Sequence, residues 1–125
     1  MKVLDTSVAI DHLRGLDAAV NLLAEALGGG EALVASEVVR FELLAGAHGK
    51  EMAVLEDFAS ALSWVPVSEE VARTAAALAR RHRRSHSGID DADYLIAATA
   101  LLLDAELLTT NVRHFPMIPE LRAPY

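Results

Sequence analysis

Short apolar runs alternate along the chain with longer segments of helical periodicity. Four runs predict buried strands, at residues 2–5, 31–35, 64–67 and 106–109. Pro66 interrupts the third run and indicates that this strand lies at an edge of the sheet. The intervening segments predict helices at residues 6–15, 18–27, 37–45, 50–62, 69–84 and 90–103. Strands that alternate with helices predict an α/β fold with a mostly parallel sheet.

Residues that commonly cap helices stand where the first three helices are predicted to start. Asp5 or Thr6 can cap the first helix, Asp17 the second and Ser36 the third. Asp90 and Asp91 offer the same possibility for the last helix. These positions support the predicted helix starts independently of the apolar periodicity.

Two predicted strands are each followed by a polar side chain that could contribute to a site. Asp5 ends the first strand, and Asn111 stands two residues beyond the last one. In α/β folds, ligand sites collect beyond the carboxyl ends of the strands. Asp also favours helix caps and Asn favours turns, so each residue has a structural interpretation beside the functional one.

Glu42 and Asp93 are carboxylates on predicted helices with small and apolar neighbours. The residues one turn away from Glu42 are Val38, Val39, Ala45 and Gly46. A carboxylate on such a face is unfavourable unless it is paired or binds a metal. Asp93 opens the segment YLIAATALLL, which is apolar on all sides and is predicted to be buried. With Asp90 and Asp91 available as caps, Asp93 is interpreted as a surplus carboxylate with a role in a site.

Three carboxylates from distant segments, Asp5, Glu42 and Asp93, are predicted to converge on one sheet edge around a cation. Oxygen ligands without His or Cys favour Mg²⁺ or Mn²⁺ over zinc. Such a site positions phosphate oxygens and activates a bound water for in-line attack. The sequence contains no H-E-x-x-H, G-x-x-x-x-G-K-[ST], G-x-G-x-x-G or G-x-S-x-G motif, which argues against zinc proteases, P-loop proteins, Rossmann domains and serine hydrolases.

Composition is consistent with one globular domain over residues 1–125. Apolar residues make up 53% of the chain, and there are no cysteines, which excludes disulfides and thiolate metal sites. The N-terminus has no signal-peptide pattern, and no apolar stretch is long enough to span a bilayer. We therefore expect a soluble, cytoplasmic protein that does not associate with membranes.

The net charge of −7 gives no overall indication of nucleic-acid binding. The basic residues are nevertheless unevenly distributed, since four of the 11 Lys and Arg residues lie within five positions, at Arg80, Arg81, Arg83 and Arg84. This cluster is either a solvated helix end that complements the helix dipole or a surface that binds RNA phosphates.

Four segments together resemble the PIN-domain family, and specifically the VapC-type toxins of bacterial toxin–antitoxin pairs. They are VLDTSVAI at residues 3–10, SEVVRFELLAG at 36–46, DADYLIAATA at 91–100 and LLTTNVRHF at 107–115. The segments occur in the order and spacing of the family and cover nearly the whole chain.

The resemblance implies a three-layer α/β/α domain around a sheet of four or five strands, a homodimer, and Mg²⁺- or Mn²⁺-dependent cleavage of RNA. It also implies inhibition by a cognate VapB-type antitoxin. By position, Asp5, Glu42 and Asp93 match the acidic ligands, and Asn111 holds a fourth catalytic place where many relatives have Asp. The positions that would support the site are Thr6, Ser7, Asp90, Asp91 and Thr109.

Two other interpretations remain open on the residues alone. A strand followed by Asp-Thr-Ser is also found in phosphoaspartyl hydrolases and receiver domains. Those proteins need a Lys near a later strand, whereas the only lysines here are Lys2 and Lys50. The second alternative is a non-catalytic RNA-binding or scaffold domain, against which the complete set of three acidic residues argues.

Overall fold

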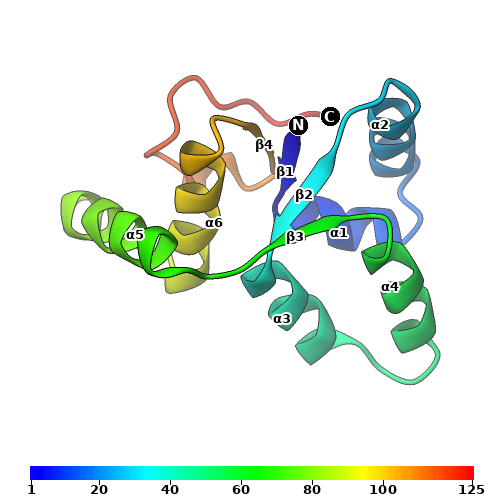
Figure 1. Cartoon of the computed structure of the whole chain (residues 1–125). Coiled ribbons are helices and arrows are strands. Elements are labelled where there is room, and N and C mark those ends of the chain that lie inside the picture. Colours follow the sequence, from blue (N-terminus) through cyan, green and yellow to red (C-terminus); the bar gives the residue numbers. More distant parts are fainter.

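Four short strands form a single parallel sheet in the computed structural model, which describes all 125 residues (Figure 1). The strands are β1 (Lys2–Leu4), β2 (Leu33–Ser36), β3 (Ser63–Val65) and β4 (Glu106–Leu108). Their order across the sheet is β3-β2-β1-β4, and every neighbouring pair is parallel. The predicted parallel sheet is confirmed, and β3 lies at an edge, as the proline beside it indicated.

The centre of the sheet contains the point at which the strand order reverses. Lys2 of β1 is in register with Leu33 of β2 on one side and with Glu106 of β4 on the other. The chain leaves β1 toward β2 and returns much later to add β4 on the opposite side. In parallel sheets, the crevice at such a reversal, beyond the carboxyl ends of the strands, is the usual ligand site. Asp5 and Thr109 are the residues that directly follow these two strands.

Six α-helices and one short 3₁₀-helix connect the strands. They are α1 (Thr6–Leu13), α2 (Asp17–Gly28), α3 (Glu37–Gly46), α4 (Glu51–Ala59), α5 (Glu69–His82), α6 (Asp91–Leu102) and η1 (Val112–His114). The prediction for α4 began one residue too early and ended three residues too late, because the chain turns at Ser60 to enter β3. The expected Asp17 cap was also wrong, since Leu16 occupies the cap position and Asp17 is the first helical residue.

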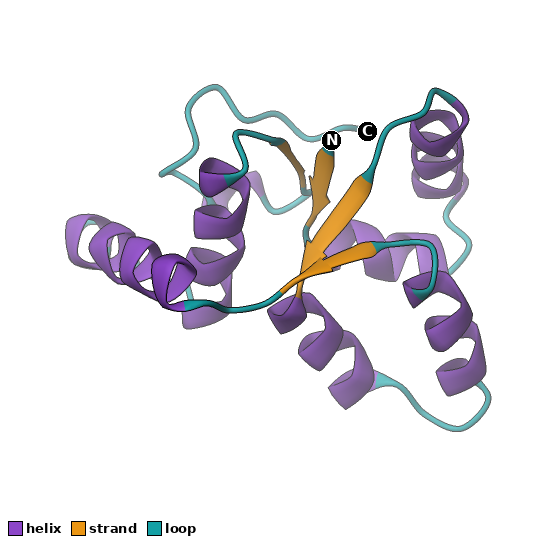
Figure 2. Ribbon diagram, viewed as in Figure 1, coloured by secondary structure: helices purple, strands orange, loops and turns teal.

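The helices enclose the sheet in three layers (Figure 2). The pair α5 and α6 lies on one side, and α1, α2 and α4 lie on the other. Helix α3 continues directly from β2, where the Ser36 side chain accepts a hydrogen bond from Val38 N, as expected for a cap. This direct continuation places α3 immediately beyond the carboxyl end of the sheet.

The core includes both faces of the two central strands, where Val3, Leu4, Val34 and Ala35 are buried. Such two-sided burial is typical of a parallel sheet between helical layers. The segment from Asp93 to Ala100 on α6 is also buried except for the partly exposed Leu95, largely as its apolar sequence predicted. The prediction was wrong for residues 101–103, which are exposed at the C-terminal end of α6.

None of the six helices combines the length and the apolar character that a bilayer crossing requires. The C-terminal segment returns to the first helix, where the Tyr125 hydroxyl donates a hydrogen bond to Asp11 Oδ2 at 2.6 Å. Both ends of the chain therefore lie on the same side of the molecule (Figure 1).

Candidate active site

Asp5 is the most constrained polar residue at the carboxyl end of the sheet. It occupies the cap position of α1, yet its side chain makes no capping hydrogen bond. Instead, Oδ2 accepts hydrogen bonds from Ser7 Oγ at 2.8 Å and from Thr109 Oγ1 at 2.7 Å. The residue is only 3% exposed. The interpretation of the Asp5 side chain as a helix cap is therefore wrong, and its second oxygen, Oδ1, accepts no hydrogen bond from the protein.

A backbone network fixes the orientation of the two hydroxyls that hold Asp5. Thr110 N donates to Ser7 Oγ at 3.1 Å, and Asn111 N donates to Thr109 Oγ1 at 3.0 Å. Because each hydroxyl already accepts a backbone proton, its own proton is directed to Asp5. The end of β4 thus holds the end of β1. Asn111 contributes through its backbone, and its side chain is exposed beside this network.

Glu42 approaches the same edge from α3. Thr6 Oγ1 donates a hydrogen bond to Glu42 Oε1 at 2.6 Å, so the residue next to Asp5 in sequence fixes the second carboxylate. Glu42 is partly buried, and of its predicted apolar neighbours Val39 is buried whereas Ala45 and Gly46 are exposed. The contact with Thr6 satisfies one Glu42 oxygen and joins α1 to α3 at the site.

Asp93 completes a reciprocal capping arrangement at the start of α6. Asp90 Oδ1 accepts from Asp93 N, and Asp93 Oδ2 accepts from Asp90 N, both at 3.2 Å. Asp93 is therefore not surplus to capping, contrary to the sequence interpretation. The same oxygen, Oδ2, lies 3.3 Å from His114 Nδ1, which leaves Oδ1 without a protein partner. One carboxylate oxygen thus stabilises the helix while the other remains free for a ligand.

The surroundings of Asp93 disfavour its charged form. Burial is the largest cause, and the nearby negative charges of Asp90 and Asp5 add to it. Against the opposing hydrogen bond from the Asp90 backbone and the charge of His114, these effects raise the pKa of Asp93 to about 6. Asp5 is thus one of the nearby negative charges that oppose ionisation of Asp93.

The other acidic residues of this region face different partners. The Asp91 carboxylate is exposed and pairs with Arg83 at 2.9 Å rather than with another site residue. Asp90 is exposed and caps α6. The supporting roles expected for Thr6, Ser7 and Thr109 correspond to the hydrogen bonds described above. Of the four clustered arginines, three lie at the exposed end of α5 or just beyond it without an ion-pair partner, namely Arg80, Arg81 and Arg84.

The fold brings Asp5, Glu42 and Asp93 to one edge of the sheet. In this arrangement no three acidic or histidine side chains are close enough together to enclose a metal ion. Each carboxylate is oriented by a donor of its own: Asp5 by two hydroxyls, Glu42 by Thr6 and Asp93 by the Asp90 backbone. Each of the three side chains also has a second oxygen that accepts no hydrogen bond from the protein.

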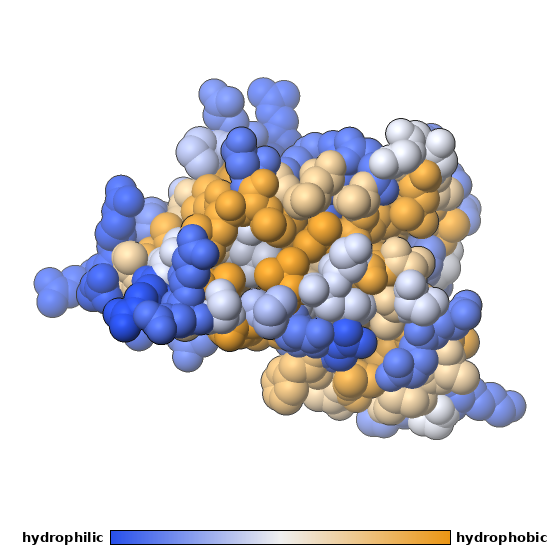
Figure 3. All heavy atoms as spheres, viewed as in Figure 1, coloured by the Kyte–Doolittle hydropathy of each residue, from blue (hydrophilic) through white to orange (hydrophobic).

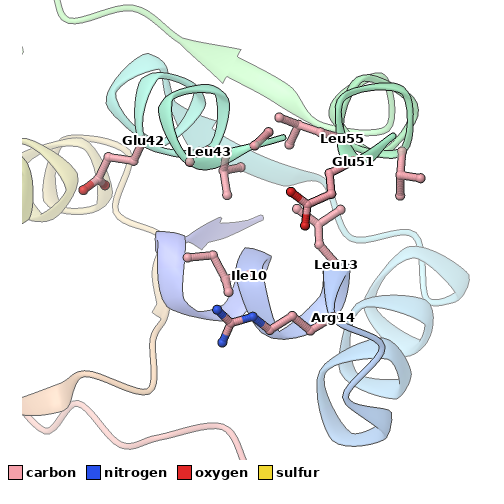
Figure 4. Close-up of a pocket in the computed structure, with 10 residues that line it drawn as sticks. Ile10, Leu13, Arg14, Glu42, Leu43, Glu51 and Leu55 are labelled. Carbon is pink, nitrogen blue, oxygen red and sulfur yellow. The ribbon is translucent and has the colours of Figure 1, made fainter. Parts of the chain in front are cut away.

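An apolar groove of about 350 Å³ begins at Glu42 and runs between α1, α3 and α4 (Figure 4). Ile10 and Leu13 point into it from α1, while Glu42 lies at the end nearest α6 and Glu51 lies on the α4 side. The residues that line it are Ile10, Leu13, Arg14, Glu42, Leu43, Gly46, Ala47, Glu51, Val54 and Leu55. The groove is therefore continuous with the acidic edge.

His114 is the site residue that the sequence reasoning missed. It lies on η1, and its Nδ1 is 3.3 Å from Asp93 Oδ2. Only its position in the sequence, three residues after Asn111, could have indicated this role. Residues that directly follow the last strand lie near the carboxyl edge of the sheet, where ligand sites occur.

Comparison with known proteins relates this geometry to other chains. The PIN domain model matches residues 2–120. Ribonuclease VapC19 of Mycobacterium tuberculosis (strain ATCC 25618 / H37Rv) is 62% identical over 125 residues, which is 100% of both chains. Ribonuclease VapC10 of the same strain is 41% identical and aligns over 100% of this chain and 93% of its own length.

Solved structures show the same fold at lower sequence identity. VapBC2 from Rickettsia felis, bound to a DNA fragment from its promoter, superposes with a TM-score of 0.82 at 26% identity, covering 98% of this chain and 96% of that one. A toxin–antitoxin complex from Klebsiella pneumoniae gives 0.77 at 26% identity, covering 100% and 98%. The carboxylate-bearing sheet edge and these matches together establish that the chain belongs to the PIN-domain family.

Proposed function

We infer that the chain is a VapC-type endoribonuclease and the toxin of a VapBC toxin–antitoxin pair. The observation that carries this inference is the full-length identity of 62% to Ribonuclease VapC19. The site adds a physical reason, because a buried carboxylate at the sheet reversal, fixed by two hydroxyls, lies at the same edge of the sheet as two further carboxylates from α3 and α6. Such a toxin acts in the cytoplasm, where its RNA substrate is found.

We propose that Asp5, Glu42 and Asp93 would hold Mg²⁺ or Mn²⁺. Their chemistry fits these ions, since the donors are all oxygens and each side chain has an oxygen that accepts no protein hydrogen bond. Burial is the main cause of the raised pKa of Asp93, and the charges of Asp90 and Asp5 add to it, so a dication that neutralises this buried carboxylate would be favoured. When bound, such an ion supplies Lewis acidity toward a phosphate oxygen and lowers the pKa of a bound water.

The protein's own contribution is orientation of the carboxylates before substrate arrives. Ser7 and Thr109 hold Asp5, and Thr6 holds Glu42. The Asp90 backbone holds Asp93. Side chains that are already bonded in this way lose little freedom on binding, which favours precise placement of a phosphodiester group. Asn111 is exposed beside Thr109 and adds a neutral amide at the position of a fourth acidic ligand.

We expect purified protein to cleave structured RNA with Mg²⁺ or Mn²⁺ and to lose this activity in EDTA. Cleavage of total cellular RNA is followed by mapping the new 5′ ends, with the Asp5→Asn variant prepared in parallel to exclude a contaminating nuclease. Full cleavage in EDTA would contradict metal dependence. RNA binding without cleavage under any metal condition would instead favour the non-catalytic interpretation.

We further propose that the cognate antitoxin inserts an apolar segment with a basic side chain into the groove beside Glu42. The groove floor is apolar, and its charged lining residues are two carboxylates, Glu42 and Glu51, and one arginine, Arg14, in a protein of net charge −7. An Arg is well suited to pair with such carboxylates through two parallel hydrogen bonds. The similar toxin–antitoxin complex from Klebsiella pneumoniae supports an antitoxin as the partner.

Val54→Arg is expected to prevent neutralisation by the antitoxin while leaving RNA cleavage intact. Val54 lines the groove and is 58% exposed, so a charged side chain there does not disturb the core but opposes apolar docking. Expression of the parent should slow growth, and co-expression of the small neighbouring gene product should restore it. With Val54→Arg, restoration should fail. Met52→Arg, on the same helix outside the groove, is the control, and equal rescue of both variants would contradict this docking site.

The homodimer that the resemblance implies stays a proposal. Phe41 on α3 is 70% exposed and provides an apolar surface that a second copy could cover. Sedimentation equilibrium of the parent and of Phe41→Glu tests this, since a dimer that buries Phe41 should dissociate in the variant.

A further inference from the structure

The last turn of α5 carries the densest positive charge in the molecule. Arg80, Arg81 and Arg84 are exposed and form no ion pair, and we call these three residues the arginine surface. Arg83 differs, because its guanidinium pairs with Asp91 at 2.9 Å and lies 5.9 Å from the centre of the Tyr94 ring. Figure 3 shows strongly hydrophilic atoms gathered over the outer end of α5. One arginine thus joins α5 to α6 while three remain available.

Arg83, which lies next to Arg84 in sequence, connects this end of α5 to the start of α6 through its ion pair. Asp91, the partner of Arg83, begins α6, and Asp93 lies two residues further along the same turn. On the other side of Asp93, His114 brings η1 into contact, with the exposed and unpaired Arg113 next to it in sequence. Besides the end of α5, η1 therefore contributes an exposed arginine close in sequence to a residue that contacts Asp93.

Complementing the α5 dipole does not require this many cations. That effect is confined to the last turn of a helix, and α5 ends at His82, so Arg84 lies beyond it. Like charges in consecutive positions repel one another, which is unfavourable for the isolated protein. Phosphate groups placed between them would convert this repulsion into attraction.

We propose that the arginine surface binds the phosphate backbone of the RNA substrate and directs the strand across the start of α6 to the acidic edge. This inference rests on the proposed function as a ribonuclease. An acidic protein repels a polyanion over most of its surface, so a local cationic approach is needed beside the site. The first turn of α6 is a poor alternative, because the Asp90 and Asp93 carboxylates lie there and would repel a phosphate group.

The test is the affinity of the full chain for a fluorescein-labelled 15-nucleotide poly(U) RNA, measured by fluorescence anisotropy in EDTA at several salt concentrations. The triple variant Arg80→Ala/Arg81→Ala/Arg84→Ala should bind about tenfold to a hundredfold more weakly near 0.1 M salt. Its slope of log K against log salt should fall by roughly 0.7 for each lost phosphate contact. The corresponding triple Lys variant keeps the charges and should recover most of the affinity and slope.

Arg73→Ala is the matched control. Arg73 lies on the exposed side of the same helix, but it is paired with Glu69 at 2.8 Å, so its removal should leave affinity and slope unchanged. Thermal melts of all variants confirm that the fold is retained. An unchanged affinity and slope in the triple Ala variant would overturn the inference, as would a loss confined to a duplex DNA probe. Failure of the proposed function would look different: the parent protein would then cleave no RNA with Mg²⁺ or Mn²⁺.

Discussion

Asp5→Asn should reduce RNA cleavage by on the order of 10²–10³-fold or more while leaving the fold intact. The amide oxygen of Asn can still accept the hydrogen bonds that Ser7 and Thr109 donate to Oδ2, so the connection between β1 and β4 persists. The negative charge is lost, however, and with it the attraction for a dication at the sheet reversal. The measurement is the initial rate of cleavage of a mapped RNA site at saturating Mg²⁺, together with the melting temperature.

Asp57→Asn is the control for this prediction. Asp57 is exposed on α4, its side chain makes no hydrogen bond, and the same change of chemistry there should alter neither the rate nor the melt. Activity of Asp5→Asn within about tenfold of the parent, in a folded protein, would remove Asp5 from the catalytic group.

The architecture could be predicted from the sequence because the apolar pattern and the strand–helix alternation agree at every element. Pro66 indicated the edge strand, and the buried part of α6 followed from its uniformly apolar segment. Element ends were less predictable. The last residues of α4 and α5 depend on where the chain turns to reach β3 and α6, which is a property of tertiary packing rather than of local periodicity.

The sequence also indicated which end of the sheet carries the site, but not how its side chains are bonded. Asp5 follows a strand and could be placed at the edge, whereas its bonding to Thr109, 104 residues away, depends on β4 lying beside β1. The contact between His114 and Asp93 likewise depends on tertiary structure and could not be predicted from the sequence. Capping was misjudged at Asp93 because a carboxylate can hold a helix start and keep a free oxygen at the same time.

Asp93→Asn is expected to stabilise the metal-free protein at neutral pH, with a gain that disappears in acid. The pKa of Asp93 in the folded protein is raised to about 6 from the usual 3.8, chiefly by burial. Below pH 4 the carboxyl is neutral in both folded and unfolded chains, so it contributes no difference. Between pH 4 and 6 only the unfolded chain loses its proton, and the folded state becomes relatively less stable. Above pH 6 the full cost of the buried charge is present.

At about 1.4 kcal/mol per pH unit, the raised pKa corresponds to a cost of about 3 kcal/mol at pH 7, or about 10 °C in melting temperature for a chain of this size. Asn removes this cost and can still accept the hydrogen bond from Asp90 N. The measurement is a set of paired melts in EDTA from pH 4 to pH 8, in which the difference between variant and parent should grow toward neutral pH. Added Mg²⁺ should reverse the order by stabilising only the parent.

His114→Gln separates the effect of burial on the Asp93 pKa from the effect of the neighbouring charge. Protonated His114 opposes the rise in the Asp93 pKa, so its removal should raise that pKa further and extend the loss of stability to higher pH. In the double variant Asp93→Asn/His114→Gln, the melting temperature should no longer show the pH dependence caused by Asp93, because the titrating carboxyl is gone. If the difference in melting temperature between Asp93→Asn and the parent stays constant from pH 4 to pH 8, Asp93 is not held in a desolvated, negatively charged site.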